Sequence, residues 1–285
     1  MAQHEVKREN GFYVLDQIVN GRDVCARYSK ESVERIFLPL LREWTLLQRC
    51  LKRRILIFLA APPGAGKSTL ANFLQALSAD TEGIEPVEAV GMDGFHHDQD
   101  YLLSHTVALN GKDVPLVSIK GAPVTFDLPK LTQRIRQLKT DAVCPWPLYN
   151  RQLHNPEEGK IRVRGNIVLL EGNYLLLDAE GWRELKSECD YSVSILADEG
   201  QLRERLIQRK MLSGIPRREA EAFVDRSDLA NARLCSCMQP SDLTLRLTGS
   251  GEYVRERNAN ISATRRESAP QTGTSSASDG FGLGP

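Results

Sequence analysis

One glycine-rich segment, Ala61-Pro-Pro-Gly-Ala-Gly-Lys-Ser68, constrains this chain more than any other feature. It follows the apolar run Ile55–Ala60 and leads into Ser68-Thr-Leu-Ala-Asn-Phe-Leu74, an order that predicts a strand, a tight loop and a helix start. The two glycines let backbone N–H groups wrap an anion, and the N-terminus of the helix favours negative charge. The segment therefore predicts a phosphate-binding site.

The side chains of this loop have separate predicted roles. Lys67 can reach the β- and γ-phosphates of a nucleotide, and the Ser68 hydroxyl suits Mg²⁺. Ala61 stands where glycine is usual, which is compatible with the loop if its φ is negative. The other predicted nucleotide contacts are Pro63, Gly64, Ala65, Gly66 and Thr69. A chance loop before a core helix is the alternative, and the agreement of loop, lysine, hydroxyl and flanking elements argues against it.

Size and charge narrow the class of protein. The chain has 285 residues with 37 basic and 37 acidic side chains, so one large core is expected and nothing in the net charge favours nucleic acid or an anionic membrane. No apolar run approaches the ~20 residues of a membrane span. Six scattered cysteines without a signal peptide indicate reduced thiols in a cytoplasm. We expect a cytoplasmic protein with small-molecule partners, and leave a homodimer open.

Strand and helix patterns alternate along the chain. Strands are predicted at 55–60, 87–91, 166–170, 191–196 and 243–247, and helices at 68–78, 127–139, 179–187, 198–213 and 216–234. Strands that alternate with helices indicate an α/β protein with a mostly parallel, doubly wound sheet.

The two ends of the chain differ from this pattern. Segments 12–19 and 23–28 flank Asn20-Gly21, a strong hairpin signal, and a helical stripe follows from Ser29 to Cys50. We predict a hairpin and helix over 1–50 packed on a core domain of 51–257. The tail, 258–285, is rich in Ser, Thr, Gly and Ala, and is predicted to be disordered.

Ligands of a parallel sheet bind outside the carboxyl ends of its strands, which draws attention to Asp93. Asp93 follows the predicted strand 87–91 and is a candidate general base that accepts a proton from an acceptor hydroxyl. His96 and His97 follow it as candidate substrate contacts. The alternative is structural: Asp93-Gly94 as a turn, or His96-His97-Asp98 as a helix cap.

A second acid follows another strand. Glu171 ends the apolar run Ile167–Leu170 and is followed by glycine. An acid at this place commonly holds Mg²⁺ directly or through water, which would complement Ser68. The alternative is a solvent-facing acid at a strand end.

Polar and aromatic residues between these two strand ends predict an acceptor pocket. They lie in Lys120–Asp127 and Trp146–Pro156, read as irregular, proline-rich chain. The candidate substrate contacts here are Phe126, Tyr149, Arg151 and His154. The alternative is a crossover loop whose aromatics fill the core. A zinc site from the histidines lacks ligand spacing.

A basic helix is the predicted lid. The segment 198–218 carries Arg205 and Arg209 at i and i+4, which could neutralise charge on a transferring phosphoryl group. Charged residues on a helix are more often a solvated face, so only some are expected to act.

Together these motifs resemble the P-loop kinase group of uridine kinases, phosphoribulokinases and type I pantothenate kinases, over about residues 10–257. The chain is most similar to bacterial nucleoside/nucleotide kinase family proteins, also described as fructose transport system kinase homologues. They share Ala60–Ser68, Met92–His97, Lys120–Pro123, Thr125–Asp127, Trp146-Pro147 and Val168–Asn173.

The resemblance implies a three-layer α/β/α kinase that uses ATP and Mg²⁺. Lys67 and Ser68 would then contact phosphates and metal, Asp93 would be the base, Glu171 would lie at the metal, and Asn231 would lie near the adenine. His96-His97 and the N-terminal hairpin depart from uridine and pantothenate kinases, so neither substrate carries over.

Two functions follow. The first is an ATP-dependent kinase that phosphorylates a hydroxyl of a nucleoside, vitamin precursor or sugar. The second is an ATP-binding regulatory or chaperone-like protein without acceptor turnover. The acids at two strand ends favour the first.

Overall fold

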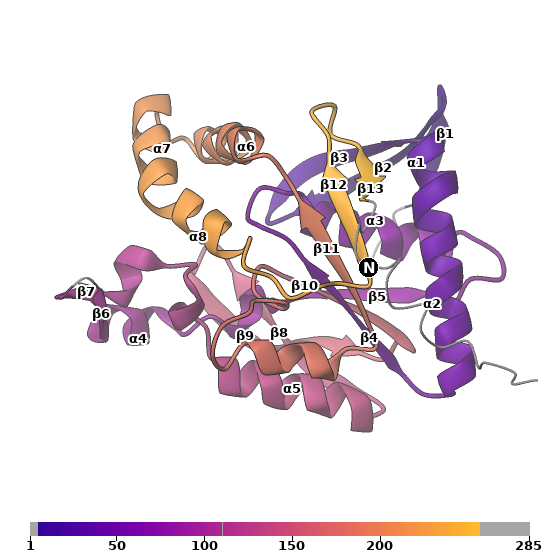
Figure 1. Ribbon diagram of the computed structural model, residues 1–285, viewed down its shortest axis with the longest axis horizontal. Helices are drawn as coiled ribbons and strands as arrows, with labels where there is room; N and C mark the ends of the chain where they lie inside the picture. Colours follow the sequence, from indigo (N-terminus) through magenta and orange to yellow (C-terminus); the bar gives the residue numbers. More distant parts are fainter. Residues whose placement is uncertain (1–4, 110, 257–285) are drawn as a thin grey trace, which may run out of the picture.

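A six-stranded sheet forms the centre of the molecule. The computed structural model describes residues 5–109 and 111–256 (Figure 1). The strand order is β5-β10-β4-β11-β12-β13, with all neighbours parallel except the antiparallel edge strand β13. The strands are β4 (Ile55–Ala60), β5 (Val87–Gly91), β10 (Ile167–Gly172), β11 (Tyr191–Leu196), β12 (Leu243–Leu247) and β13 (Tyr253–Arg255). The five predicted strands and the mostly parallel α/β fold are confirmed.

Helices cover both faces of this sheet. Side chains alternate between the two faces along each strand, so each face has its own layer of packing. In β4, Ile55, Ile57 and Leu59 pack with α2 (Leu38–Leu51) and α3 (Lys67–Ala79). The intervening Leu56 and Phe58 pack against α5 (Leu128–Thr140) on the opposite face. All of β4 is buried, as expected for a central parallel strand. The result is the expected three-layer α/β/α architecture, visible in Figure 1.

The helix before β4 starts where the sequence predicts. The Ser29 hydroxyl accepts a hydrogen bond from the Ser32 N–H at 3.1 Å and caps α1 (Lys30–Ser32). A π-helical turn, Val33–Phe37, joins α1 to α2 without a break. Lys52 ends α2 in the left-handed conformation, with a φ of 52°.

Four of the five other predicted helices form, and one does not. Two of them are α3 and α5, and the third is α6 (Glu199–Met211). The fourth is a continuous helical segment that consists of α7 (Arg217–Phe223), a π turn (Val224–Asp228) and α8 (Leu229–Leu234). The predicted helix 179–187 is wrong: only a 3₁₀ segment, Arg183–Glu188, is present. Gly181 has a φ of 77°, which interrupts an α-helix there, and the buried pair Trp182 and Leu185 fits a three-residue period as well.

The predicted N-terminal hairpin is present and has one more strand than expected. It joins β2 (Phe12–Val19) to β3 (Arg22–Ser29), and β1 (Lys7–Glu9) pairs with β2 through a further Asn-Gly turn. Tyr13, Leu15 and Tyr28 are buried in the same cluster as β4 and α3. The hairpin and first helix thus share a core with the phosphate loop, while the limits 1–50 and 51–257 stay predictions.

The segment predicted as irregular, 146–156, is instead mostly a hairpin. It forms β8 (Cys144–Asn150) and β9 (Asn155–Val163), which pair only with each other. Two-stranded sheets leave outward N–H groups unpaired, so Pro145 is tolerated, and Pro147 lies at the register shift between Trp146 and Leu148.

Three smaller elements and the chain end complete the description. A helix, α4 (Gln99–Ser104), precedes the hairpin of β6 (Thr106–Leu109) and β7 (Lys112–Pro115), which projects at the left of Figure 1. The predicted disordered tail, 258–285, lies outside the described residues. Within 5–109 and 111–256, no helix has both the length and the apolar character that crossing a bilayer requires.

Candidate active site

Three strand ends meet at one edge of the sheet. Strand β10 lies between β4 and β5, with Glu171 opposite Leu59 on one side and Gly91 on the other. The phosphate loop follows β4, and Asp93 follows β5 in a short 3₁₀ turn, Met92–Phe95. The parallel register therefore brings the loop, Asp93 and Glu171 together.

The phosphate loop has the backbone that its glycines allow. Gly64 and Gly66 have φ values of 87° and 89°, in the left-handed region that side chains rarely adopt. A Cβ at Gly66 would lie 2.8 Å from Tyr253 Oη and 3.2 Å from Arg205 Nη2. Ala61 is absent from the residues with positive φ, as the prediction required. The cradle fits the phosphates of a nucleotide.

Other predicted loop residues have structural contacts as well. The carbonyl of Ala65 accepts a hydrogen bond from Tyr253 Oη at 2.8 Å, and the carbonyl of Thr69 accepts one from Gln17 Nε2 at 3.2 Å. Arg205 lies beside Gly66, at the outer side of the loop. These bonds fix the loop against β13 and the N-terminal hairpin.

Ser68 and Glu171 lie in direct contact. Ser68 Oγ donates a hydrogen bond to Glu171 Oε1 at 2.7 Å. Burial raises the pKa of Glu171, and the positive charge of Lys67 acts against that rise. Mg²⁺ prefers carboxylate and hydroxyl oxygens, so the residues present fit the predicted magnesium site. A bound cation would stabilise the charged form of the Glu171 carboxylate, which burial disfavours.

Asp93 is held from two directions. Arg151 Nη2 donates to Asp93 Oδ2 at 3.0 Å, and the ring Nδ1 of His96 lies 2.8 Å from the Asp93 carbonyl oxygen. Burial acts to raise the pKa of Asp93, but its electrostatic interactions with His96, Arg151 and Lys67 lower it below its ordinary value. Asp93 is therefore an ionised carboxylate at neutral pH.

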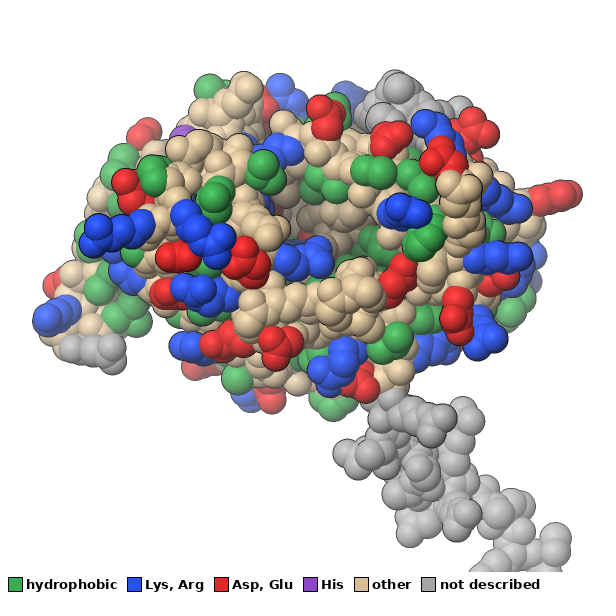
Figure 2. Space-filling model, turned by 90° about the horizontal axis from the view of Figure 1, so that it is seen from above, with side chains coloured by type: hydrophobic (Ala, Val, Ile, Leu, Met, Phe, Trp, Pro, Cys, Tyr) green, Lys and Arg blue, Asp and Glu red, His purple; other side chains and the backbone are tan. Residues whose placement is uncertain are grey.

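A cleft of about 270 Å³, the main cleft, opens at this edge of the sheet. It brings together most of the predicted site residues: Pro63, Lys67, Ser68, Asp93, His96, Phe126, Tyr149, Arg151, His154, Arg209 and Asn231. A second hollow of about 220 Å³ shares Ser68, Asp93 and Tyr149 with it and also reaches Glu171. The surface seen from above is hollowed near its centre, with basic and acidic side chains at the rim (Figure 2).

Aromatic rings pack along one side of the main cleft. The ring of His96 lies 3.8 Å from that of Phe126 and 5.2 Å from that of Tyr149 between centroids. Burial lowers the pKa of His96 and favours its neutral form, whereas the carboxylate of Asp93 acts in the opposite direction. The side chain of Phe126 is buried, so it contributes to the core as well as to the cleft.

One predicted residue lies outside both hollows. His97 lines neither of them, and its ring stacks on Tyr101 at 4.0 Å, while Tyr101 stacks on His105. Asn231 lines the main cleft, and its amide nitrogen would lie 3.3 Å from a Cβ at Gly121. Its predicted place near an adenine stays a prediction.

Several lining residues were not predicted as site residues: Asn20, Lys120, Gly121, Asn173 and Asp228. Lys120 and Asn173 do lie within segments shared with kinases. Lys120 Nζ donates to Gln99 Oε1 at 2.9 Å and lies 5.3 Å from the Tyr149 ring centroid. The sequence around Asn20 predicts only a turn. Nothing local to Asn20 indicates which other element it will face.

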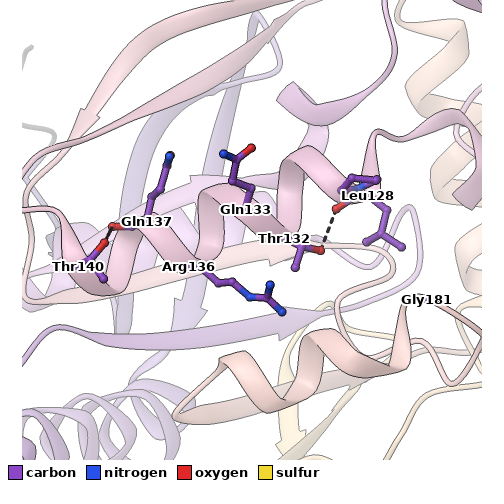
Figure 3. Close-up of a pocket in the computed structure, with 8 residues that line it drawn as sticks. Leu128, Thr132, Gln133, Arg136, Gln137, Thr140 and Gly181 are labelled. Carbon is purple, nitrogen blue, oxygen red and sulfur yellow. Dashed lines mark hydrogen bonds between the residues drawn. The ribbon is translucent and has the colours of Figure 1, made fainter.

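Another hollow, about 660 Å³, is a groove along α5 (Figure 3). It contains none of the predicted site residues. Two of its hydroxyls donate hydrogen bonds to backbone carbonyls of α5 itself. Thr132 donates to the Leu128 carbonyl at 2.8 Å, and Thr140 donates to the Gln137 carbonyl at 3.3 Å. These two hydroxyls are therefore already occupied as donors.

Comparison with known proteins adds to this geometry. No protein-family model matches the chain. It is 41% identical over 241 residues to the uncharacterized protein YggC of Escherichia coli strain K12, covering 84% of this chain and 98% of that protein. It is 31% identical over 186 residues to a Schizosaccharomyces pombe protein named "Putative uridine kinase C227.14". This match covers 63% of this chain and 77% of that protein.

A solved structure agrees with these relatives. The crystal structure of a "putative fructose transport system kinase" from Silicibacter sp. TM1040 matches with a TM-score of 0.60 and 38% identity. The match covers 67% of this chain and 89% of the other. With the phosphate loop and the acids at the adjoining strand ends, these similarities confirm the predicted family: the chain belongs to the P-loop kinase group that includes uridine kinases, phosphoribulokinases and pantothenate kinases.

Proposed function

We propose that this protein is an ATP-dependent kinase that transfers the γ-phosphoryl group to a hydroxyl of a small metabolite. The observation that carries the proposal is the shared edge of the sheet: Ser68 and Glu171 are joined by a 2.7 Å hydrogen bond, and Asp93 lines the same hollow. Metal ligands and a candidate base are thus adjacent, as phosphoryl transfer requires.

The phosphate loop and Lys67 would hold the nucleotide phosphates, and Ser68 and Glu171 would hold Mg²⁺. When bound, the metal would supply charge neutralisation on the phosphoryl oxygens. Arg209 lines the main cleft and Arg205 lies beside Gly66, so each can add positive charge near the phosphates.

Asp93 would act on the acceptor. Its Oδ2 is bonded to Arg151, while Oδ1 has no hydrogen bond to another residue of the described ranges and can accept one from a hydroxyl. Asp93 takes the hydroxyl proton as that oxygen bonds the γ-phosphorus and the bond to the β–γ bridging oxygen breaks, with ADP as the leaving group.

The acceptor would lie against the aromatic side of the main cleft. His96, Phe126 and Tyr149 offer ring faces, and Arg151 and His154 offer polar contacts. These groups suit a nucleoside, a vitamin precursor or a sugar.

The test combines turnover with nucleotide binding. The protein is incubated with Mg-ATP and a panel of nucleosides, sugars and vitamin precursors, and a mass gain of one phosphoryl group is followed. Asp93→Asn should retain ATP binding and lower kcat by about 10²- to 10⁴-fold. Lys67→Ala should weaken ATP binding and also lower kcat. Asp100→Asn, the same change at an exposed carboxylate on α4, is the matched control.

Two results would contradict the proposal. Full turnover in Asp93→Asn would remove the assigned base. ATP binding without phosphorylation of any acceptor would favour an ATP-binding regulatory protein.

A further inference from the structure

The hairpin of β2 and β3 is fixed to the phosphate-binding part of the protein at both ends. Near its turn, the buried Gln17 donates from Nε2 to the carbonyl of Thr69 in α3 at 3.2 Å. At its far end, the Ser29 N–H donates to Glu252 Oε1 at 2.9 Å. These bonds determine where the turn lies.

The turn reaches the site. Asn20 and Gly21 have φ values of 57° and 76°, the left-handed pair typical of a tight two-residue hairpin turn. Asn20 lines both the main cleft and the second hollow, as do Ser68, Asp93 and Tyr149. A residue distant in sequence from the phosphate loop therefore lines the same two hollows as the candidate base.

The hairpin also contacts the predicted lid. Arg22, the second residue after Asn20, donates from Nη1 to the carbonyl of Arg209 at 2.6 Å and from Nη2 to Ser213 Oγ. Arg209 itself lines the main cleft. The hairpin turn and the end of α6 are thereby joined across the opening of the site.

Three polar groups around the hollows have no partner in the described part of the chain. Tyr149 Oη and Asn173 Oδ1 are buried without a hydrogen bond, and the exposed Asn20 amide makes none to any residue of 5–109 or 111–256. Leaving buried polar atoms unpaired costs free energy, so such atoms suit the polar groups of a ligand. An amide offers both a donor and an acceptor, which matches a hydroxyl.

The residues that line the second hollow restrict the chemical class of the ligand. Besides the phenol of Tyr149, its ionisable lining residues among those described are the carboxyls Asp93 and Glu171. The hairpin contributes the apolar Ile18 and Val19 to its lining, and β8 and β9 contribute Leu148 and Ile161. An anionic part of the acceptor would be repelled in the second hollow, whereas a neutral polyhydroxy part fits there. The main cleft differs, because its lining also carries Lys67, Lys120, Arg151 and Arg209.

Building on the proposed function, we propose that the β2–β3 turn forms one wall of the acceptor site, and that Asn20 determines acceptor specificity. Its amide binds a hydroxyl of a neutral polyhydroxy acceptor whose reacting hydroxyl lies at Asp93.

The test uses two Asn-Gly turns of the same sheet. Asn20→Gly removes the amide while keeping a residue that tolerates positive φ, and Asn10→Gly makes the same change at the β1–β2 turn, where Asn10 has a φ of 48° and lines neither hollow. Binding of neutral sugars and nucleosides, and of their phosphorylated forms, is measured by thermal shift and calorimetry with a non-hydrolysable ATP analogue present.

The proposal expects neutral polyols to bind the wild type and Asn10→Gly alike, and to bind Asn20→Gly about tenfold or more weakly. Affinity for the ATP analogue should be unchanged in all three. Equal acceptor affinity in Asn20→Gly would overturn the proposal. Binding of only the phosphorylated forms, or of no compound of the panel, would overturn it as well.

Turnover separates this inference from the proposed function. If the bound polyol is phosphorylated, Asn20→Gly should raise KM for the acceptor with KM for ATP unchanged. If a polyol binds through Asn20 and is never phosphorylated, the kinase proposal fails while the binding inference stands. If phosphorylation proceeds with the same acceptor KM in both variants, the inference fails and the kinase proposal stands.

Discussion

The phosphate side and the acceptor side of the site are built in different ways. The phosphate side comes from one continuous segment, β4, the loop and α3, whose geometry is set by Gly64 and Gly66. The acceptor side is assembled from the β2–β3 turn, the segment after β5, the chain around Lys120 and the β8–β9 hairpin. A local motif thus determines nucleotide binding in the proposed site, while strand pairing and long-range packing bring in Asp93, Glu171 and the acceptor side.

This difference explains which roles can be separated by mutation. Substitutions in the phosphate segment should alter nucleotide binding whichever acceptor is used. Substitutions in the hairpins should alter acceptor binding and leave nucleotide binding intact. The following changes test that separation.

Gly66→Ala should give the largest effect on the phosphate side. The new Cβ would be strained at a φ of 89° and would meet Tyr253 Oη at 2.8 Å. We expect ATP affinity to fall about 10- to 100-fold, measured by calorimetry. Gly83→Ala is the control, since Gly83 also has positive φ, 80°, but nothing lies within 4 Å of its Cβ. Unchanged ATP affinity in Gly66→Ala would show that the loop is not the nucleotide cradle.

Arg151→Gln should give an intermediate effect on the acceptor side. Burial acts to raise the pKa of Asp93, and neighbouring cations including Arg151 hold it below its ordinary value. A base works only above its pKa, so activity is lost as pH falls through that value. Removing one cation raises the pKa, and the acid limb of the kcat profile should move to higher pH.

The measurement is a pH–rate profile, in which the acid limb should move while kcat at neutral pH, where Asp93 stays ionised, changes by about twofold or less. Arg183→Gln breaks a comparable exposed pair, 3.2 Å from Asp178, and should leave the profile in place. An acid limb that does not move in Arg151→Gln would argue that Asp93 is not the titrating base. A change in ATP affinity would break the proposed separation of the two sides.

Tyr253→Phe should give the smallest effect. Burial raises the pKa of Tyr253 to about 12, so its hydroxyl stays protonated and donates to the Ala65 carbonyl. Losing that bond should lower the free energy of unfolding by about 1 kcal/mol and raise KM for ATP by about two- to threefold. Urea unfolding and ATP kinetics measure this. Tyr13→Phe is the control, because the Tyr13 hydroxyl bonds no other described residue. A changed acceptor KM would contradict the prediction.

The same contrast accounts for what the sequence could predict. The five parallel strands were predictable because each is a short segment of continuous or alternating apolar residues. The parallel register then brings Asp93 and Glu171 to one edge. Hairpin β8–β9 was missed because Pro145 and Pro147 indicate irregular chain unless the pairing partner is known. The place of Asn20 depends on how the hairpin packs through Gln17 on α3, which no local pattern encodes.

The isolated pairing of β8 with β9 has a consequence for how such proteins diversify. Because these strands hydrogen-bond to each other and belong to a sheet of their own, their length and sequence can change without unpairing any strand of the six-stranded sheet. Descendants of one ancestral phosphotransferase could therefore acquire new acceptors by exchanging this hairpin, while the inherited nucleotide cradle remained the same.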